Sequence, residues 1–225
     1  GKRANMVCDY CEAVPRAAVD LAGTELTMQD NKIISLGKSA HGSTPALGKN
    51  AILPILELFR ENEDVNRVIE CLFEDVFGLR HMMDETGSLT LSPDIITFHK
   101  GVLAVVCDIR YPATVALSDV LSAVNKFGVK YETLHHQKPL FHDKNSGLIT
   151  TLLGVYKEFA APADDVQPIA IGGGTYARAL KNGVAFGPEM HGDEAVIHQP
   201  NEYITLDRVK LLLNIYKAAI ERLTK

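Results

Sequence analysis

The sequence predicts an α+β domain, in which helices cover one face of an antiparallel sheet, followed by part of an α/β domain. Two observations support this prediction. In residues 1–141, segments typical of strands meet through hairpins and alternate with segments typical of helices. From Asp143 onward the order changes to strand, loop and helix, as in an α/β sheet. We therefore expect two domains, at residues 1–141 and 142–225.

The strands of the first domain are expected where apolar and β-branched residues cluster between turn signals. Gly23 and the Gln-Asp-Asn segment at 29–31 supply turns near the start. The His-Lys-Gly segment at 99–101 divides one long apolar segment into two strands. The segments typical of strands are 4–14, 31–40, 88–112 with its central turn, and 130–141.

Three helices are expected between these strands. The apolar residues of the first recur at helical spacing on one face, at Ile52, Ile55, Leu56 and Phe59. Pro54 lies in its first turns, where a missing backbone amide is tolerated. The expected helices are 46–62, 65–78, which Gly78 ends, and 117–128, which Ser118 could cap.

The second domain contains too few strands to stand alone. Only two of its segments, 169–171 and 183–188, are typical of strands, and an independent α/β domain needs more. We infer that strands outside the given chain complete this sheet. Helices are expected at 143–159, directly after the glycines at 172–174, and from Thr205 onward.

Composition excludes several classes of function. The 225 residues are 46% hydrophobic and carry a net charge of −5, so we expect a sizeable core and no basic surface for nucleic acid. No apolar segment approaches the roughly 20 residues of a membrane span, and the first residues do not resemble a signal peptide. Four cysteines are too few for a disulfide framework and suit a reducing cytoplasm. Cys8 and Cys11 form a C-x-x-C motif, but no second pair follows to complete a zinc site.

Two residues of the first domain could carry chemistry. His41, in the segment SAHGSTPALGKNA, lies between a strand and a helix and can project a donor into a cleft. A histidine on a surface turn is the simpler alternative. Arg110 ends the strand in VVCDIRYP, where its planar fork of donors suits a carboxylate. An ordinary ion pair with a nearby acid is the alternative for Arg110.

Two segments of the second domain could also bind a ligand. Gly172, Gly173 and Gly174 precede a helix, so their successive amides favour an anion. Because the spacing is neither a dinucleotide fingerprint nor a P-loop, a carboxylate fits better than a phosphate, and a tight turn without a ligand is the alternative. His198, in the extended segment AVIHQPNEYI, could bind a metal, although one histidine does not define a site.

Taken together, these segments resemble a known family. AHGSTPALGKNA, DIRYP, GGGTYAR and HQPNEYI occur in this order, and at comparable spacing, in the di-zinc exopeptidases of the aminoacylase and carboxypeptidase group. The resemblance is closest to the peptidase V branch of dipeptidases, and it covers nearly the whole chain. It implies that residues 1–141 are a substrate-capping lid and that residues 142–225 are the C-terminal part of a zinc-peptidase catalytic domain.

The resemblance also implies a role for each candidate residue. His41 matches the lid histidine that polarises the scissile carbonyl oxygen. Arg110 and the glycines at 172–174 match the elements that hold the C-terminal carboxylate of the substrate. Asn5 matches a lid asparagine that contacts the substrate, and His198 matches a terminal zinc ligand.

The chain departs from the family in the rest of the metal site. It contains no Glu-Glu pair, and its one H-x-D motif, at His191 to Asp193, lies in an irregular loop, where we interpret it as chance. The two zinc ions of the family, which manganese or cobalt could replace, need several ligands each. We therefore expect the N-terminal half of the catalytic domain to lie outside this chain, and the chain alone to be inactive.

Three functions stay open at this point. The leading one is a cytoplasmic, zinc-dependent dipeptidase that cleaves small peptides with a free C-terminal carboxylate. The second is an N-acyl-amino-acid or N-succinyl deacylase of the same group, and the third is a non-catalytic lid-type module for assembly. A monomer is slightly favoured, because in this group an enlarged lid often replaces a dimer partner.

Overall fold

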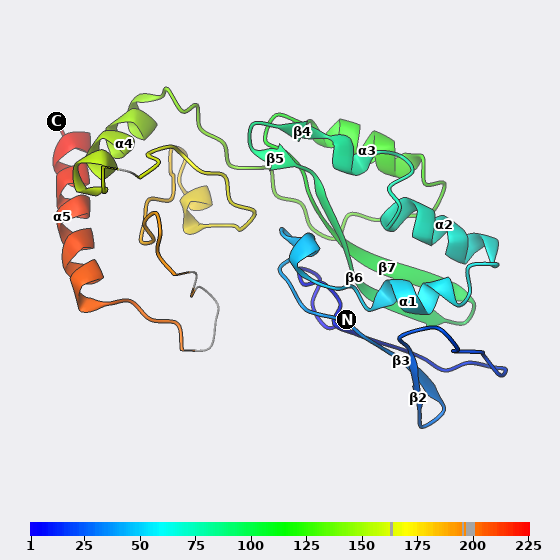
Figure 1. The fold of residues 1–225 in the computed structure, drawn as a ribbon. Coiled ribbons are helices and arrows are strands. Elements are labelled where there is room, and N and C mark those ends of the chain that lie inside the picture. The colour runs from blue at the N-terminus through cyan, green and yellow to red at the C-terminus, as the bar shows by residue number, and fades with distance from the viewer. Residues whose placement is uncertain (163, 195, 197–200) are drawn as a thin grey trace. The chain divides into compact units, whose positions relative to one another are not determined.

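A computed structural model describes the whole chain except residues 163, 195 and 197–200 (Figure 1). The chain forms two compact units, Gly1–Pro139 and Leu140–Lys225. Buried apolar side chains make two clusters in the first unit and one in the second. Each unit therefore has a core of its own, and the assignment of lid and catalytic roles to the two expected domains stays a prediction.

A three-stranded antiparallel sheet lies near the start of the first unit, in the order β1, β3, β2. Its tight turn uses Asp30 and Asn31, whose φ angles of 50° and 61° are left-handed. Asp and Asn tolerate this conformation better than most side chains, and the turn confirms the expectation at 29–31. The strands are β1 (Tyr10–Ala13), β2 (Thr27–Gln29), which the sequence did not reveal, and β3 (Lys32–Leu36).

The longest strands pair as an antiparallel hairpin, as expected from residues 88–112. Its turn uses Lys100 and Gly101, which have φ angles of 49° and 81°. Thr90 pairs with Arg110 at the open end, and a bulge leaves Asp94 without a cross-strand partner. The hairpin consists of β6 (Thr90–His99) and β7 (Val102–Arg110), and a short pair, β4 (Met83–Asp84) and β5 (Gly87–Ser88), precedes it.

The three expected helices of the first unit form, with different ends. The first is shorter because the backbones of Lys38 and Lys49 pair through hydrogen bonds of 2.8 and 2.9 Å, which hold the preceding segment out of the helix. The expected cap at Ser118 is wrong, because Ala116 is the N-cap of the third helix. The helices are α1 (Ile52–Glu57), α2 (Glu63–Leu72), which ends well before Gly78, and α3 (Leu117–Asn125).

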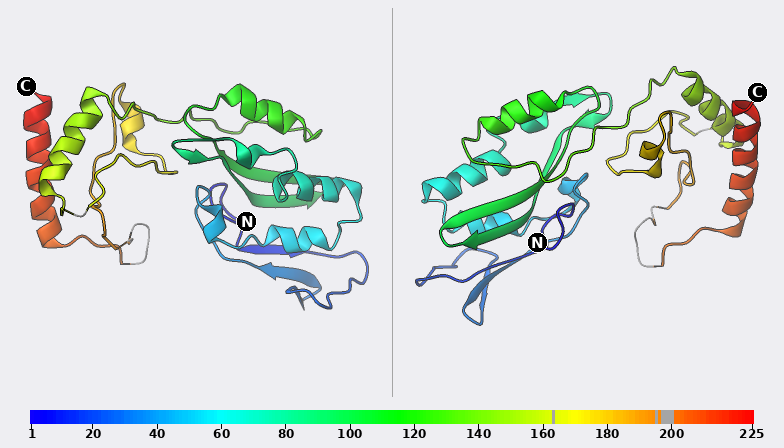
Figure 2. Two further views of the ribbon diagram at one scale, coloured as in Figure 1. Left: turned by 45° about the horizontal axis from the view of Figure 1, so that its top comes forward. Right: turned by 180° about the vertical axis from the view of Figure 1, so that it is seen from behind.

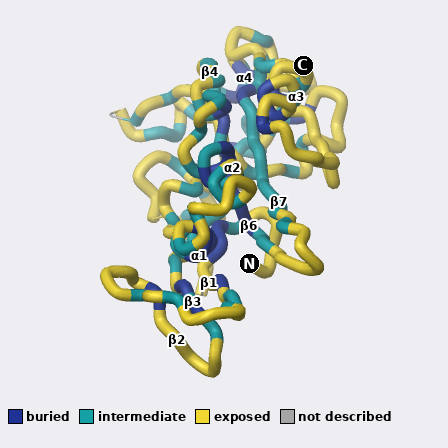
Figure 3. Tube along the Cα trace, turned by 90° about the vertical axis from the view of Figure 1, so that its right-hand side faces the viewer, coloured by how far each residue is buried: buried dark blue, intermediate teal, exposed yellow. Residues whose placement is uncertain are grey.

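The helices of the first unit pack on one face of the β6–β7 hairpin. Val105, Cys107 and Ile109 alternate along β7 and contact the apolar cluster of α2 and α3. Leu103, on the same face, contacts the cluster that α1 shares with β1 and β3. Figure 2 shows the helices running alongside the hairpin, and Figure 3 shows that buried positions concentrate in α1 and β6. The other face of β7 therefore carries Asp108 and Arg110.

The expected strand at 130–141 is wrong. This segment is extended but pairs with no strand, and most of its residues are exposed. A strand needs a neighbour to satisfy its backbone donors and acceptors, and β6 and β7 pair with each other instead. The single antiparallel sheet that the sequence predicts is likewise divided into three smaller antiparallel sheets in the residues that the structure describes.

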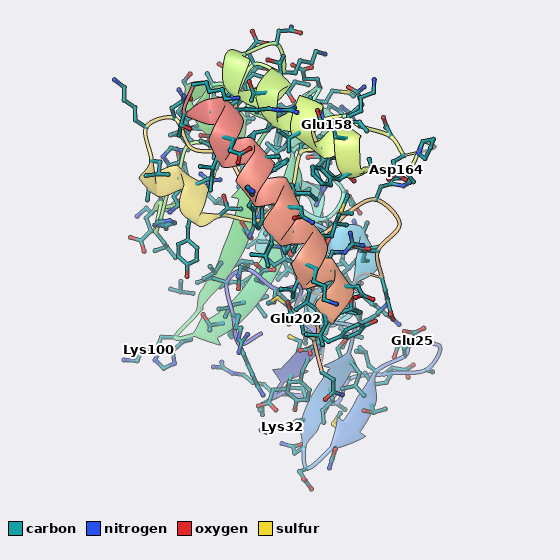
Figure 4. The ribbon with its side chains drawn as sticks, turned by 90° about the vertical axis from the view of Figure 1, so that its left-hand side faces the viewer. Glu25, Lys32, Lys100, Glu158, Asp164 and Glu202 are labelled. Carbon is teal, nitrogen blue, oxygen red and sulfur yellow. The ribbon has the colours of Figure 1, made fainter. Side chains whose placement is uncertain are left out.

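Two antiparallel helices dominate the second unit. Their core is formed by Leu152 and Val155 from one helix and by Leu212, Ile215 and Ala219 from the other. Thr205 caps the second helix by accepting a hydrogen bond from a backbone amide at 3.2 Å, and the expected start there is confirmed. The elements are α4 (Gly147–Phe159), the 3-10 turn η3 (Tyr176–Ala179) and α5 (Leu206–Leu223). Figure 4 labels Glu158, which lies in the last turn of α4.

The two strands expected in the second unit do not form. Residues 169–171 and 183–188 have no strand partner among the described residues. Ile169 and Ile171 are 85% and 60% exposed, although both are apolar. The sequence pattern alone cannot supply the neighbouring strand that such a segment needs.

Candidate functional site

The His41 side chain is held by its own turn. Its Nδ1 lies 2.7 Å from the Ser43 hydroxyl oxygen, and the backbone N–H of Ser43 donates to the same nitrogen at 3.3 Å. The Thr44 amide donates to the His41 carbonyl at 2.9 Å and closes the turn. His41 is half-buried, and the contacts with Ser43 hold the Nδ1 edge of its imidazole in place.

Gly42 connects the His41 turn to Asn5. The Gly42 amide donates to the Asn5 carbonyl oxygen at 2.8 Å. A Cβ atom on Gly42 would lie 2.3 Å from Oδ2 of Asp108 and 3.2 Å from the Asn5 oxygen. A side chain here would displace the Asp108 carboxylate and press on the Asn5 backbone, so glycine permits the close approach of these segments. Asn5, an exposed residue, is thereby placed beside the His41 turn.

Arg110 lies at the end of β7 and pairs with Asp108, two residues earlier on the same strand face. Its Nε and Nη2 donate to Oδ2 of Asp108 at 3.0 and 2.7 Å. Both side chains are half-buried. The pair uses two of the five N–H donors of the guanidinium. An ion pair with a nearby acid was the alternative explanation for Arg110, and that acid is Asp108.

These contacts bring three of the predicted site residues together. Thr90, opposite Arg110 in the hairpin, donates from its hydroxyl to the Gly42 carbonyl at 3.4 Å. Gly42 in turn contacts both Asp108 and Asn5. We name the set Asn5, His41, Asp108 and Arg110 the polar corner. Its imidazole and guanidinium are donors, which suit a carbonyl oxygen and an anion.

A buried carboxyl group lies next to the polar corner. Asp94, at the bulge of β6, is fully buried, and the Ser92 hydroxyl donates to its Oδ1 at 2.5 Å. Its Oδ2 has no hydrogen-bond partner within the residues that the structure describes. Burial disfavours the charged form and raises the pKa of Asp94 to about 6. Asp108 acts in the same direction, and Arg110 opposes it.

This raised pKa predicts a pH-dependent contribution to stability. The pKa of this carboxyl is near 3.9 in the unfolded chain and about 6 in the folded chain, so its protonated form favours the folded state. This contribution to stability is complete below pH 4 and is lost as the pH rises through 6. Its full size is on the order of 3 kcal/mol. We expect Asp94→Asn to gain stability relative to the unmodified chain as pH rises from 5 to 8. Urea unfolding of both proteins at each pH measures this difference, and a difference that does not change with pH contradicts it.

The remaining candidates belong to the second unit. The glycines at 172–174 precede only η3, a single four-residue 3-10 turn, where the sequence predicts a helix. The anion site expected at a helix N-terminus is therefore not built by this segment alone. A Cβ atom on Gly173 would meet nothing within 4 Å. His198 lies outside the described residues, so its predicted role as a metal ligand stays a prediction.

The described part of the chain does not assemble a metal site. No group of three or more His, Cys, Asp or Glu side chains there is placed to hold a metal ion. Cys8 and Cys11 are buried free thiols, and burial raises the pKa of Cys11 to about 11. Burial therefore favours the thiol form of Cys11 over the thiolate, which is the form that binds metals.

Sequence reasoning missed two polar residues near the site. Ser43 follows His41 by two positions, a spacing at which a serine can bond to a neighbouring side chain in a turn. Asp94 interrupts the apolar segment of β6 directly after a proline, and a lone acid in such a segment signals a buried polar group.

Comparison with known proteins identifies the family. The sequence profile described as Peptidase family M20/M25/M40 matches residues 25–222. The chain belongs to this peptidase family. A relative in Staphylococcus epidermidis named "Putative dipeptidase" is 33% identical over 98% of the chain, and Beta-Ala-Xaa dipeptidase of Lactobacillus delbrueckii subsp. lactis is 31% identical over 89%.

The matched region covers only part of each relative's own sequence. The chain spans about half the length of the curated relatives that it matches, 54% of the first and 46% of the second. Peptidases of this family are generally metal-dependent. In the described residues, no helix combines the length and apolar character needed to cross a membrane.

Proposed function

We propose that this chain is the substrate-capping lid and the C-terminal catalytic segment of a zinc-dependent dipeptidase. Its substrates are short peptides with a free C-terminal carboxylate. The polar corner carries this proposal, because Gly42 brings the turn of the His41 imidazole against Asp108, the partner of the Arg110 guanidinium. The names of the two relatives, both dipeptidases, support the same reaction class.

Each residue of the polar corner has a separate task in this proposal. The His41 imidazole donates to the scissile carbonyl oxygen, which gains negative charge as water attacks the carbonyl carbon. Arg110 binds the C-terminal carboxylate through charge-assisted hydrogen bonds. Asp108 holds one edge of the guanidinium through Nε and Nη2 and so fixes its plane. Asn5 contacts the substrate from the same corner.

The glycines at 172–174 are proposed to bind a substrate carboxylate through their backbone amides. Packing within the described chain does not require glycine at Gly173, where a side chain would meet nothing within 4 Å. A bound ligand would account for glycine at this position, because the absence of a side chain lets a substrate carboxylate approach the backbone amides.

The metal site is proposed to lie mainly outside this chain. The described residues do not fit two zinc ions, so we assign only His198 as one ligand. The other ligands then belong to the N-terminal half of the catalytic domain. A monomeric state and a cytoplasmic location stay predictions of the sequence.

The substrate class can be tested with the intact protein that contains this chain. We expect dipeptides to be hydrolysed, a chelator to abolish turnover, and added zinc or manganese to restore it. N-acyl amino acids are the matched comparison, because they share the carboxylate but lack the free amino group. Preference for N-acyl amino acids would assign a deacylase, and no hydrolysis of either class would favour the assembly module.

The 225-residue chain supplies a second arm of this test. We expect it to show no turnover of dipeptides with added zinc or manganese, because most metal ligands are proposed to lie elsewhere. Turnover well above a metal-only blank would contradict that part of the proposal.

A further inference from the structure

The hydrogen bonds of His41 determine which of its ring nitrogens carries the proton. A backbone N–H can only donate, and the Ser43 N–H donates to Nδ1 of His41. Nδ1 must therefore present its lone pair. Because a neutral imidazole has one N–H and one bare nitrogen, the proton is on Nε2.

The Ser43 hydroxyl reinforces this arrangement. Its oxygen lies 2.7 Å from Nδ1, and with the proton on Nε2 the hydroxyl donates to the bare nitrogen in a short hydrogen bond. A proton on Nδ1 would make the hydroxyl the acceptor and would set the ring N–H beside the Ser43 N–H, so that two donors would lie against each other. The amide contact thus selects the tautomer, and the hydroxyl contact is compatible with it.

The backbone of the turn is itself held in place. The Gly42 amide is bonded to the Asn5 carbonyl at 2.8 Å, and the Thr44 amide is bonded to the His41 carbonyl at 2.9 Å. Gly42 also lies in close contact with Asp108. The Ser43 N–H between these two bonded residues is therefore directed at Nδ1 before any ligand arrives.

We propose that Ser43 is a positioning residue that fixes His41 as the Nε2–H tautomer, through its hydroxyl and its backbone amide. Resting on the proposed function, this makes Nε2–H the donor that faces the scissile carbonyl oxygen. The other tautomer would present a lone pair to that oxygen and repel it. Ser43 acts on the reaction only through the His41 ring.

Nitrogen NMR of the 15N-labelled 225-residue chain tests the tautomer directly. Two-bond correlations between ring protons and nitrogens, at a pH where His41 is neutral, distinguish a bare nitrogen from an N–H nitrogen, and His41→Gln assigns the signals by their loss. We expect Nδ1 to be bare and Nε2 to be protonated. Ser43→Ala keeps the backbone amide contact and loses the hydroxyl contact, so we expect it to shift part of the signal toward the other tautomer. Ser43→Thr, which keeps the hydroxyl, should retain the original tautomer.

Kinetics of the intact enzyme give the second readout. We expect Ser43→Ala to lower kcat about 10-fold with KM nearly unchanged, the effect of one hydrogen bond, and Ser43→Thr to restore kcat. A protonated Nδ1 in the unmodified chain, or a Ser43→Ala variant unchanged in tautomer and kcat, would overturn the inference. The NMR arm needs no activity, so an enzyme without peptidase activity but with the expected tautomer refutes the proposed function alone.

Discussion

His41→Ala in the intact enzyme is expected to lower kcat by about 100-fold or more while KM changes little. Loss of one donor to a developing oxyanion typically has this effect. The bond between the imidazole and the carbonyl oxygen strengthens as the oxygen gains charge, so its loss appears mainly in kcat. The Nδ1 edge of the ring is occupied by Ser43, which leaves the donor role to Nε2.

The matched control is His99→Ala. His99 is exposed and lies at the turn end of the β6–β7 hairpin, whereas the polar corner lies at the open end, where Thr90 pairs with Arg110. We expect this control to retain the kcat of the unmodified enzyme for a dipeptide. A His41→Ala variant that also retains it would show that His41 is a surface-turn histidine.

Arg110→Ala is expected to lower kcat/KM for a free dipeptide on the order of 100-fold. Hydrogen bonds to charged groups contribute about 1.5–3 kcal/mol each in favourable cases, and the guanidinium can offer two of them to one carboxylate. A dipeptide amide has no C-terminal charge, so it should be a poor substrate before the change and lose little after it. Arg110→Lys keeps the charge without the planar fork, so its kcat/KM for the dipeptide should lie between those of the unmodified enzyme and Arg110→Ala.

The comparison of both substrates separates binding from structure. Removing Arg110 leaves Asp108 without the bonds at 2.7 and 3.0 Å, and any disturbance of the fold reduces both substrates alike. The difference between their losses in kcat/KM therefore isolates the carboxylate contribution. Equal losses for the dipeptide and its amide would mean that Arg110 serves only to pair with Asp108.

Local signals predicted the parts of the fold whose determinants are local. The hairpin turn at 99–101 and the start of α5 at Thr205 follow from turn and capping residues, and both are confirmed. The strands expected at 130–141, 169–171 and 183–188 are wrong because a strand depends on a neighbour that its own residues do not encode. Segments with similar strand-like patterns thus form strands in one place, as in β6 and β7, and remain unpaired in another.

The candidate site shows the same division between local and distant information. The motifs singled out His41 and Arg110 as residue types, and their spacing carried the resemblance. The contact of Gly42 with Asp108 and Asn5 could not be predicted, because it joins three separate segments of the chain. The burial of Asp94 likewise depends on distant segments that pack around β6, such as the one from which Asn50 donates to the Pro93 carbonyl, and an isolated segment does not reveal it.

A crystal structure of the intact enzyme with a tetrahedral phosphinate analogue of a dipeptide tests the central claim most directly. Such an analogue imitates the attacked carbonyl and keeps the free carboxylate. We expect Nε2 of His41 within about 3 Å of a phosphinate oxygen and the Arg110 guanidinium bonded to the carboxylate as well as to Asp108. An analogue bound with its carboxylate away from Arg110, or with no contact to His41, would contradict the assignment of the polar corner as the substrate site.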